Sequence, residues 1–408
     1  MKTYQFSLLS SNYHNKKALE LVLKNALAGE VLSIQDCYRL VEAPDDMINL
    51  ICEVACEMRN SSKGNVVSYS RKVFIPLTTL CRDSCGYCTF AKSPGDPAAK
   101  TLWPEEVLKI AIAGEKSGCK EALFSLGERP EMVHSIARKH LKQLGYKSML
   151  DYLYEMCNLI LRETSLIPHV NPGSLSLSEI QLLRSVSPTM GMMLENSSVR
   201  LTEPGQPHFG CPDKHPVVRL NTLKFAGASC VPFTTGILIG IGETSFEIVE
   251  SLLDIRRIHS EYGHIQEVIV QNFRAKTGTR MHGLPEPDIN HMQKILAISR
   301  IILGSDMNLQ APPNLMPNEY GIYLKSGIND WGGISPVTPD HINPEASWPN
   351  LCDVQSISAA MGHVLRERLS IYPDYLNRRD VWLDTRFHNR WCDNIDSDGY
   401  VKEEEYVL

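Results

Sequence analysis

The sequence contains no apolar run that approaches the roughly 20 residues needed to cross a bilayer, which argues against a membrane-spanning helix. It also lacks an excess of cationic side chains, because 41 Lys and Arg stand against 47 Asp and Glu, for a net charge of -6. A broad cationic surface for nucleic acid or anionic lipid is therefore not expected. These absences leave a small molecule as the expected class of substrate.

The N-terminal segment lacks the apolar core of a secretory signal, which favours a cytoplasmic protein. Its first 19 residues also contain no Arg, Asp or Glu. A short plastid transit peptide is the alternative for these residues, although such peptides are typically rich in Arg. In a reducing compartment most of the 12 cysteines are expected to be small, buried, apolar residues without disulfide bonds.

Short apolar runs alternate with longer amphipathic stretches from Val73 onward. The runs are KVFIPL, EALFSL, LIPHV, PTMGMML, VPFTTGILIG, QEVIVQNF and MNLQA, and an eighth strand is expected near Gly327 to Trp331. Strand followed by helix, repeated, implies a parallel sheet. The count favours an α/β fold of the (β/α)8 TIM-barrel type over an open, doubly wound sheet.

The chain divides into three expected parts. Residues 1–68 form an N-terminal helical extension, since apolar residues recur at helical spacing between residues 16 and 60. Residues 69–335 form the barrel core. Residues 336–408 form a C-terminal extension with an acidic tail, and a helix is expected in it from Val354 to about Arg368.

One dense group of cysteines needs a chemical explanation. Cys81, Cys85 and Cys88 follow the first predicted strand at the spacing C-x3-C-x2-C, where barrel enzymes place functional loops. Three thiolates can hold three irons of a cubane cluster and leave the fourth iron open. The sequence lacks the second C-x2-C of a zinc ribbon and the fourth nearby cysteine of a ferredoxin. A zinc site completed by a distant histidine, or merely buried cysteines, are the alternatives.

The loop LTTLCRDSCGYCTF resembles the signature of the radical S-adenosylmethionine (SAM) superfamily, including the aromatic Tyr87 before the third cysteine. The resemblance implies a [4Fe-4S] cluster on Cys81, Cys85 and Cys88, with SAM chelating the open iron. In that superfamily an electron from the cluster, supplied by an external donor, cleaves SAM and produces a 5'-deoxyadenosyl radical. The cofactors would supply the difficult chemistry.

Further motifs at predicted strand ends resemble the SAM-binding elements of this superfamily. Residues 125–128 resemble its GGE element, with Leu126 in place of the first Gly, and residues 236–243 resemble G-x-I-x-G-x-x-E. The glycine spacing of the latter does not fit a dinucleotide-binding loop. Glu195 suits ribose hydroxyls and Arg219 suits the SAM carboxylate. The expected cofactor-binding residues are Tyr87, Ser125, Gly127, Glu128, Glu195, Arg219, Gly240, Ile241, Gln271 and Asn272.

Each of these assignments has a less specific alternative. Arg219 could form a surface salt bridge, and Glu195 could be an ordinary solvated carboxylate. The polar residues Gln271 to Arg274 could simply face water at the end of a strand.

Longer segments support a narrower resemblance, from about Tyr69 to Arg368. They are YSRKVFIPLTTLCRDSCGYCTFAK, ALFSLGERPE, HVNPGSL, SPTMGMMLE, GHIQEVIVQNFRAK and GINDWGGISPVTPDHINPE. These segments resemble the 7,8-didemethyl-8-hydroxy-5-deazariboflavin (FO) synthases, specifically their cyclising ammonia-lyase subunit. The resemblance implies that a partner radical SAM subunit joins tyrosine to a ribitylaminouracil, and that this chain closes the deazaflavin ring with loss of ammonia.

Two other functions stay open. The chain could be the adduct-forming partner subunit or another tyrosine-using radical SAM enzyme, which would share the cluster and SAM sites. From a different class, it could be a non-catalytic iron-sulfur or zinc-binding protein. The motif GINDWGGISPVT favours the cyclising subunit over the first, and the SAM-like motifs argue against the second.

Within the resemblance, positions in the matched segments suggest substrate and acid-base residues. Arg274, Asn329 and Asp330 are polar groups that could bind uracil or ribityl oxygens. Ammonia loss calls for an acid-base helper, and Asp330, His169 and Glu128 are candidates from their location alone. A structural hydrogen bond is the alternative for each.

The C-terminus carries a partial match to an EF-hand calcium loop. Residues 394–399 with Glu405 at the twelfth position nearly fit the pattern, but the first ligand is Asn394 rather than Asp. Only three residues follow Glu405, too few for the exiting helix. A solvated acidic tail is therefore favoured.

Overall fold

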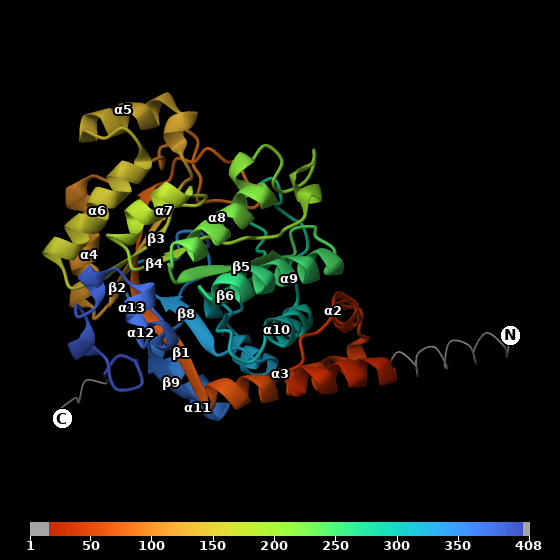
Figure 1. The fold of residues 1–408 in the computed structure, drawn as a ribbon. Helices are drawn as coiled ribbons and strands as arrows, with labels where there is room; N and C mark the ends of the chain where they lie inside the picture. Colours follow the sequence, from red (N-terminus) through yellow and green to blue (C-terminus); the bar gives the residue numbers. More distant parts are fainter. Residues whose placement is uncertain (1–15, 403–408) are drawn as a thin grey trace.

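The computed structural model describes residues 16–402, and its parallel strands close into a barrel surrounded by helices (Figure 1). Strands β1 to β8 follow one another around the barrel, and β1 pairs with both β2 and β8. The predicted (β/α)8 barrel is confirmed. The strands are β1 (Val66–Thr78), β2 (Glu121–Leu126), β3 (Ile167–Asn171), β4 (Thr189–Gly191), β5 (Phe233–Ile239), β6 (Ile265–Asn272), β7 (Leu309–Gln310) and β8 (Asp330–Ile334).

Helices cover the outside of the barrel and bury their apolar stripes against the strands. Several begin at side-chain caps, since Ser148, Ser176 and Thr244 each accept a backbone N–H of the first turn in a capping box. The helices are α4 (Pro104–Lys116), α5 (Ser135–Leu144), α6 (Met149–Glu163), α7 (Leu177–Arg184), α8 (Pro216–Ala228), α9 (Ser245–Tyr262) and α10 (Ile289–Leu303). None of the described helices is both long and apolar enough to span a bilayer.

The N-terminal part is helical, as predicted. Residues 16–27 form a helix, followed by α2 (Ile34–Val41) and α3 (Ile48–Lys63), which packs along α10. β1 then begins at Val66, so the expected boundary after residue 68 falls inside this strand. The residues of the possible transit peptide lie mostly outside the described part of the chain.

The C-terminal extension differs from the prediction. The helix α11 (Leu351–Ala360) ends before residue 361, and Gly362 follows with φ of +82°. The predicted helix to Arg368 is therefore wrong beyond Ala360, because a left-handed glycine ends a helix and Val364 to Glu367 form β9 instead. β9 pairs in parallel with the first residues of β1, and Figure 1 shows α3, β9 and α11 close together.

The rest of the extension contains α12 (Pro373–Leu376), α13 (Arg379–Trp382) and a turn closed by an antiparallel bridge between Ile395 and Val401. In that turn Asp396 accepts the backbone N–H groups of Asp398 and Tyr400 and pairs with Arg366. Glu405, the last ligand of the EF-hand match, lies outside the described residues.

Candidate active site

Cys81, Cys85 and Cys88 lie in the loop that follows β1, at the carboxyl end of the barrel. Backbone hydrogen bonds attach this loop to its surroundings: Arg82 N–H donates to the carbonyl of Glu128 at 2.7 Å, and Gly86 N–H to that of Pro207 at 2.7 Å. Cys81 Sγ also accepts the N–H of Glu128 at 3.2 Å. The loop is thus held in place by its own backbone and by the end of β2.

The three sulfurs suit an iron-sulfur cubane better than a single zinc ion. All three border one cavity of about 260 Å³, into which an open iron could face. Among the described residues the three sulfurs are not gathered within 4.8 Å of one another. Ligands of one tetrahedral zinc at Zn–S distances of about 2.3 Å would be about 3.8 Å apart. Because burial raises the pKa of Cys81 to about 12, its thiolate needs a bound metal to persist.

A fourth thiol, Cys211, reaches the cluster loop from the segment before α8. Its side chain lies within hydrogen-bonding reach of Cys85. Cys211 does not border the cavity and is buried behind Cys85. It is therefore placed away from the side on which an open iron would face the cavity.

Gly127 allows the end of β2 to approach the cluster loop. A Cβ at this position would lie 2.0 Å from the carbonyl oxygen of Leu80 and 2.8 Å from the Cβ of Cys81. Backbone cannot yield at such distances without moving the loop. Gly127 is thus required by close packing, whatever contact its backbone makes with SAM.

We expect Gly127→Ala to lower both iron content and SAM cleavage by at least about tenfold, because a loss of that size needs only about 1.4 kcal/mol of distortion. Iron analysis would measure the cluster content, and 5'-deoxyadenosine formation would measure SAM cleavage. Gly95→Ala is the matched control, since a Cβ there meets nothing within 4 Å. Normal iron and activity in Gly127→Ala would contradict the packing role.

Glu128 and Arg219 form a buried ion pair beside the cluster loop, with 3.1 Å between Arg219 Nη2 and Glu128 Oε2. Arg219 lies in the first turn of α8 and also donates to the carbonyl of Met193 at 2.5 Å. Its buried Nε has no acceptor among the described residues. An unpaired guanidinium N–H at the cavity wall fits the carboxylate of SAM. The surface salt bridge considered for Arg219 is wrong, because the side chain is buried.

Replacing Arg219 with Met should weaken SAM binding by about 10- to 100-fold, since a hydrogen bond to a charged group contributes about 1.5–3 kcal/mol. Equilibrium binding of SAM to the reconstituted protein measures this. Arg200→Met is the control, because Arg200 is paired with Glu247 outside the cavity. Unchanged SAM affinity in Arg219→Met would remove Arg219 from the cofactor site.

Glu195 lies just beyond β4 with φ of +66°, a conformation that non-glycine residues rarely adopt. Its carboxylate accepts a hydrogen bond from Lys214 Nζ at 2.6 Å. Burial opposes ionisation, yet Lys214 and Arg219 hold the pKa of Glu195 below its usual value. The residue is only 8% exposed, so it is not the ordinary solvated carboxylate considered above. An ionised carboxylate at the cavity wall fits ribose hydroxyls.

Other predicted cofactor residues divide into two groups. Tyr87, Ser125, Gln271 and Asn272 border the cavity, and both amide atoms of buried Asn272 lack a partner among the described residues. Such atoms fit a ligand with both donors and acceptors. Gly240 and Ile241 do not reach the wall: Ile241 packs with Leu238 behind it. Glu243 accepts both of their N–H groups, and their contact with the cofactor stays a prediction.

A second cavity of about 210 Å³ extends from the first into the barrel. The two cavities share six lining residues: Ser125, Asn171, Met193, Gln271, Ile342 and Asn343. We call them the upper and the lower chamber. The loop after β8 closes one side of the lower chamber, where Trp348 stacks on Phe74 with ring centroids 5.2 Å apart.

The predicted substrate and acid-base residues lie in different places. Arg274 borders the upper chamber and donates to the carbonyl of Leu315 at 2.9 Å. His169 borders the lower chamber between Thr189 at 2.8 Å and Asn171 at 3.0 Å. Burial lowers the pKa of His169 to about 4, so its imidazole is neutral near pH 7.

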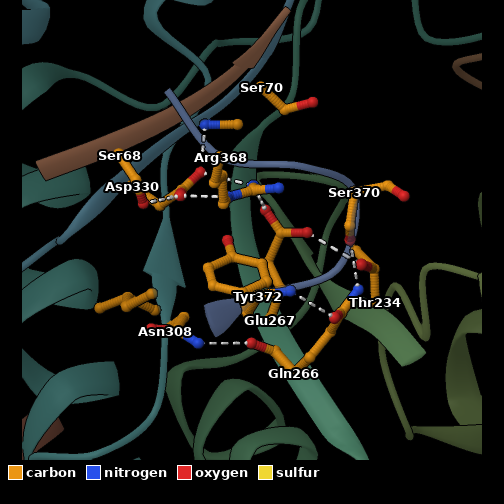
Figure 2. A network of polar contacts seen from close by, with 12 residues as sticks. Ser68, Ser70, Thr234, Gln266, Glu267, Asn308, Asp330, Arg368, Ser370 and Tyr372 are labelled. Carbon is orange, nitrogen blue, oxygen red and sulfur yellow. Dashed lines mark hydrogen bonds and ion pairs between the residues drawn. The ribbon is translucent and has the colours of Figure 1, made fainter. Parts of the chain in front are cut away.

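The structure corrects the location expected for Asn329 and Asp330. Their strand was expected to end near Trp331, but β8 begins at Asp330, so both residues lie at the amino end of the barrel. Asp330 is completely buried and binds Arg368 with both oxygens, at 2.7 and 2.8 Å (Figure 2). Asn329 is bound by Arg300 at 2.8 Å. Neither borders either chamber, because both side chains are engaged in structural networks.

Sequence reasoning missed several residues of the site. Lys214, Asp83 and Asn171 border the upper chamber, and Lys72 and Glu267 border the lower one. Asp83 stands inside the cysteine motif, so its position alone could have identified it. The others carry no local signal, since what they have in common is only that they face the same space.

A parallel barrel that holds three convergent cysteines beside a chamber suited to SAM defines a radical SAM enzyme, with a [4Fe-4S] cluster and SAM as its cofactors. Sequence comparison then gives the family. The chain is 47% identical over 380 residues to an FO synthase of Nocardia farcinica, and 48% identical over 313 residues to a 7,8-didemethyl-8-hydroxy-5-deazariboflavin synthase of Methanopyrus kandleri. The chain belongs to the FO synthase family.

The two relatives differ in length. The match covers 90% of this chain but only 44% of the Nocardia protein, so the chain spans about half the length of that relative. The Methanopyrus protein is matched over 93% of its length and 77% of this chain. No protein-family model matches the chain.

Solved structures support the fold. The FeFe-hydrogenase maturase HydG of Carboxydothermus hydrogenoformans superposes with a TM-score of 0.71 at 18% identity, covering 98% of this chain and 86% of that one. Methylornithine synthase (PylB) superposes with a TM-score of 0.66 at 18% identity, over 84% and 97% of the two chains. At these identities the likeness concerns the fold alone.

Proposed function

We propose that this protein is the cyclising subunit of FO synthesis: it converts the tyrosine-ribitylaminouracil adduct to the deazaflavin FO and releases ammonia. The adduct is 5-amino-5-(4-hydroxybenzyl)-6-(D-ribitylimino)-5,6-dihydrouracil, supplied by a partner radical SAM subunit. An external donor provides the electron.

The observation that carries this proposal is the match to the Methanopyrus protein. That protein is named a deazariboflavin synthase and is covered over 93% of its length, so one barrel of this kind accounts for nearly all of it. This chain matches only 44% of the longer FO synthase of Nocardia farcinica, which therefore has room for a second unit of similar size. This division is consistent with two cooperating subunits, of which the present chain is one.

The connected chambers suit an elongated substrate, of which one part meets the cofactor in the upper chamber and the other part is buried in the lower chamber. When bound, the cluster and SAM would supply the radical chemistry for hydrogen abstraction from the substrate. Arg219 and Glu195 would hold the SAM carboxylate and ribose in the upper chamber. The lower chamber reaches into the barrel, so a substrate that fills it would displace water and limit side reactions of a radical.

Among the three acid-base candidates, His169 is the best placed to assist ammonia loss. It borders the lower chamber, and to exchange a proton with the substrate it would have to release its hydrogen bond to Thr189 or to Asn171. Glu128 is bound by Arg219 and by the backbone N–H of Ser174, and Asp330 is held by Arg368 at the other end of the barrel.

The experiment is an anaerobic assay of the reconstituted protein with reductant, SAM and the purified adduct. Deazaflavin fluorescence together with 5'-deoxyadenosine and ammonia is the expected result. Formation of 5'-deoxyadenosine without deazaflavin would show that the adduct is not the substrate, although the protein would still be a radical SAM enzyme. Adduct formation from tyrosine and the ribitylaminouracil would instead identify the partner subunit, and an intact cluster that never cleaves SAM would indicate a non-catalytic protein.

A further inference from the structure

The floor of the lower chamber is polar, although the barrel wall above it carries aromatic and aliphatic side chains such as Phe74, Leu123 and Ile269. Lys72, Thr234 and Glu267 form this floor. Thr234 and Glu267 come four residues before Leu238 and Gln271 of the upper chamber, which is about 13 Å along a strand. A ligand that extends from the cluster into the barrel therefore ends at charged groups.

Lys72 is the cation of this floor. It is 8% exposed, and its Nζ lies 3.0 Å from Oε1 of fully buried Glu121. Burial opposes ionisation of Glu121, yet Lys72 and His169 lower its pKa, so it is a carboxylate that balances the ammonium. An ammonium has three N–H donors. Because Glu121 is the one carboxylate that pairs with this ammonium among the described residues, N–H donors remain for a ligand in the chamber.

The neighbouring strand leaves room for this side chain. A Cβ at Gly333 of β8 would lie 2.1 Å from Cε of Lys72, so any other residue there would displace the lysine chain from its place along the β8 backbone. Glu267 faces the same space and is held by Arg368 at 3.2 Å and by the hydroxyl of Thr234 at 2.9 Å (Figure 2). The floor thus presents a donor and an acceptor in fixed positions.

We propose that Lys72 is a specificity-determining residue that binds the hydroxyl groups of the ribityl chain, which places the polyol on the chamber floor and the aromatic part of the adduct toward the cluster. This inference rests on the proposed function. A polyol offers donors and acceptors along an extended chain, which matches a floor of ammonium, hydroxyl and carboxylate. The hydroxybenzyl group matches the aromatic and aliphatic wall higher in the barrel.

The test pairs a side-chain change with a substrate change. Lys72→Met is compared with the wild-type protein on the full adduct and on an adduct whose ribityl chain is replaced by ethyl. Binding is measured by calorimetry without reductant, and KM and kcat by deazaflavin formation. We expect Lys72→Met to weaken binding of the full adduct and raise its KM by about 10- to 100-fold. Binding of the ethyl adduct should change less than about threefold, since about one RT at most is then involved.

Lys72→Met leaves the buried carboxylate of Glu121 without its cation and could destabilise the fold. Two further variants keep the result interpretable in that case. Lys72→Met combined with Glu121→Gln removes both charges, and Lys72→Arg keeps the cation. Lys120→Met is the matched control, because Lys120 precedes β2 and borders neither chamber. Iron content and SAM-binding affinity should match the wild type in all of them.

The outcomes separate the two proposals. If Lys72→Met weakens binding of both adducts equally, or of neither, Lys72 does not bind the ribityl hydroxyls. Failure of the wild-type protein to bind the adduct or to form deazaflavin would overturn the proposed function itself, independently of any variant.

Discussion

Cys85→Ala is expected to lose the iron-sulfur cluster and to reduce 5'-deoxyadenosine formation to the level of assays without protein. The reason is that three thiolates are the minimum set that holds a cubane while leaving one iron open. Removing any of them leaves two irons without protein ligands. Iron and sulfide analysis, visible absorption and electron paramagnetic resonance of the reduced protein would measure the loss.

Two control variants sharpen this prediction. Cys211→Ala removes the thiol that approaches Cys85 from behind, and we expect it to retain iron and SAM cleavage, because Cys211 does not border the cavity. Cys352→Ala removes an exposed thiol far from the cluster loop in sequence. Loss of iron in Cys211→Ala would make Cys211 a fourth ligand and close the iron that the proposed chemistry needs open.

Asp330→Leu is expected to lower the free energy of unfolding by about 3–5 kcal/mol, because it leaves the guanidinium of Arg368 buried without its main partner. Arg368 is 2% exposed and lies between Asp330 and Glu267 at the amino end of the barrel (Figure 2). It comes directly after β9, so this pair also attaches the C-terminal extension to β8. Urea unfolding of the anaerobic protein, followed by circular dichroism, would measure the change.

The matched control for Asp330 is an exposed ion pair. Asp254→Ala breaks a pair with Arg257, whose side chain is 65% exposed, and should change stability by less than about 1 kcal/mol. Asp330→Asn tests the sequence-based prediction that Asp330 is an acid-base residue for ammonia loss. If that variant folds with normal stability and cleaves SAM but releases no ammonia, Asp330 acts in the reaction and its structural role is secondary.

Several features of the site could be predicted because they depend on residues close together in the chain. The spacing of Cys81, Cys85 and Cys88 is set within eight positions, so one loop brings all three to the same cavity. Glu195 and Arg219 follow or begin recognisable elements. Since the strands of a barrel expose their carboxyl ends together, residues at those ends meet in the upper chamber.

The error over Asp330 shows where this reasoning stops. Periodicity identified a strand near the right residues, but its bounds were three residues too early. Gly327, with φ of +86°, ends a 3-10 helix before the strand begins. A shift of this size moves a side chain from one end of a barrel to the other, and only the register between β8 and β1 determines which end it occupies.

The sequence by itself determined the barrel, the cluster-binding loop and the family, because each follows from local spacing or from long matched segments, and it predicted most of the polar residues that border the upper chamber. Only the tertiary structure decided that Lys214 pairs with Glu195, that Cys211 lies behind the cluster loop, and that Lys72 forms a polar floor with Glu267. These contacts join residues on different strands and loops. Closure of the barrel, rather than any local pattern, brings them into one space.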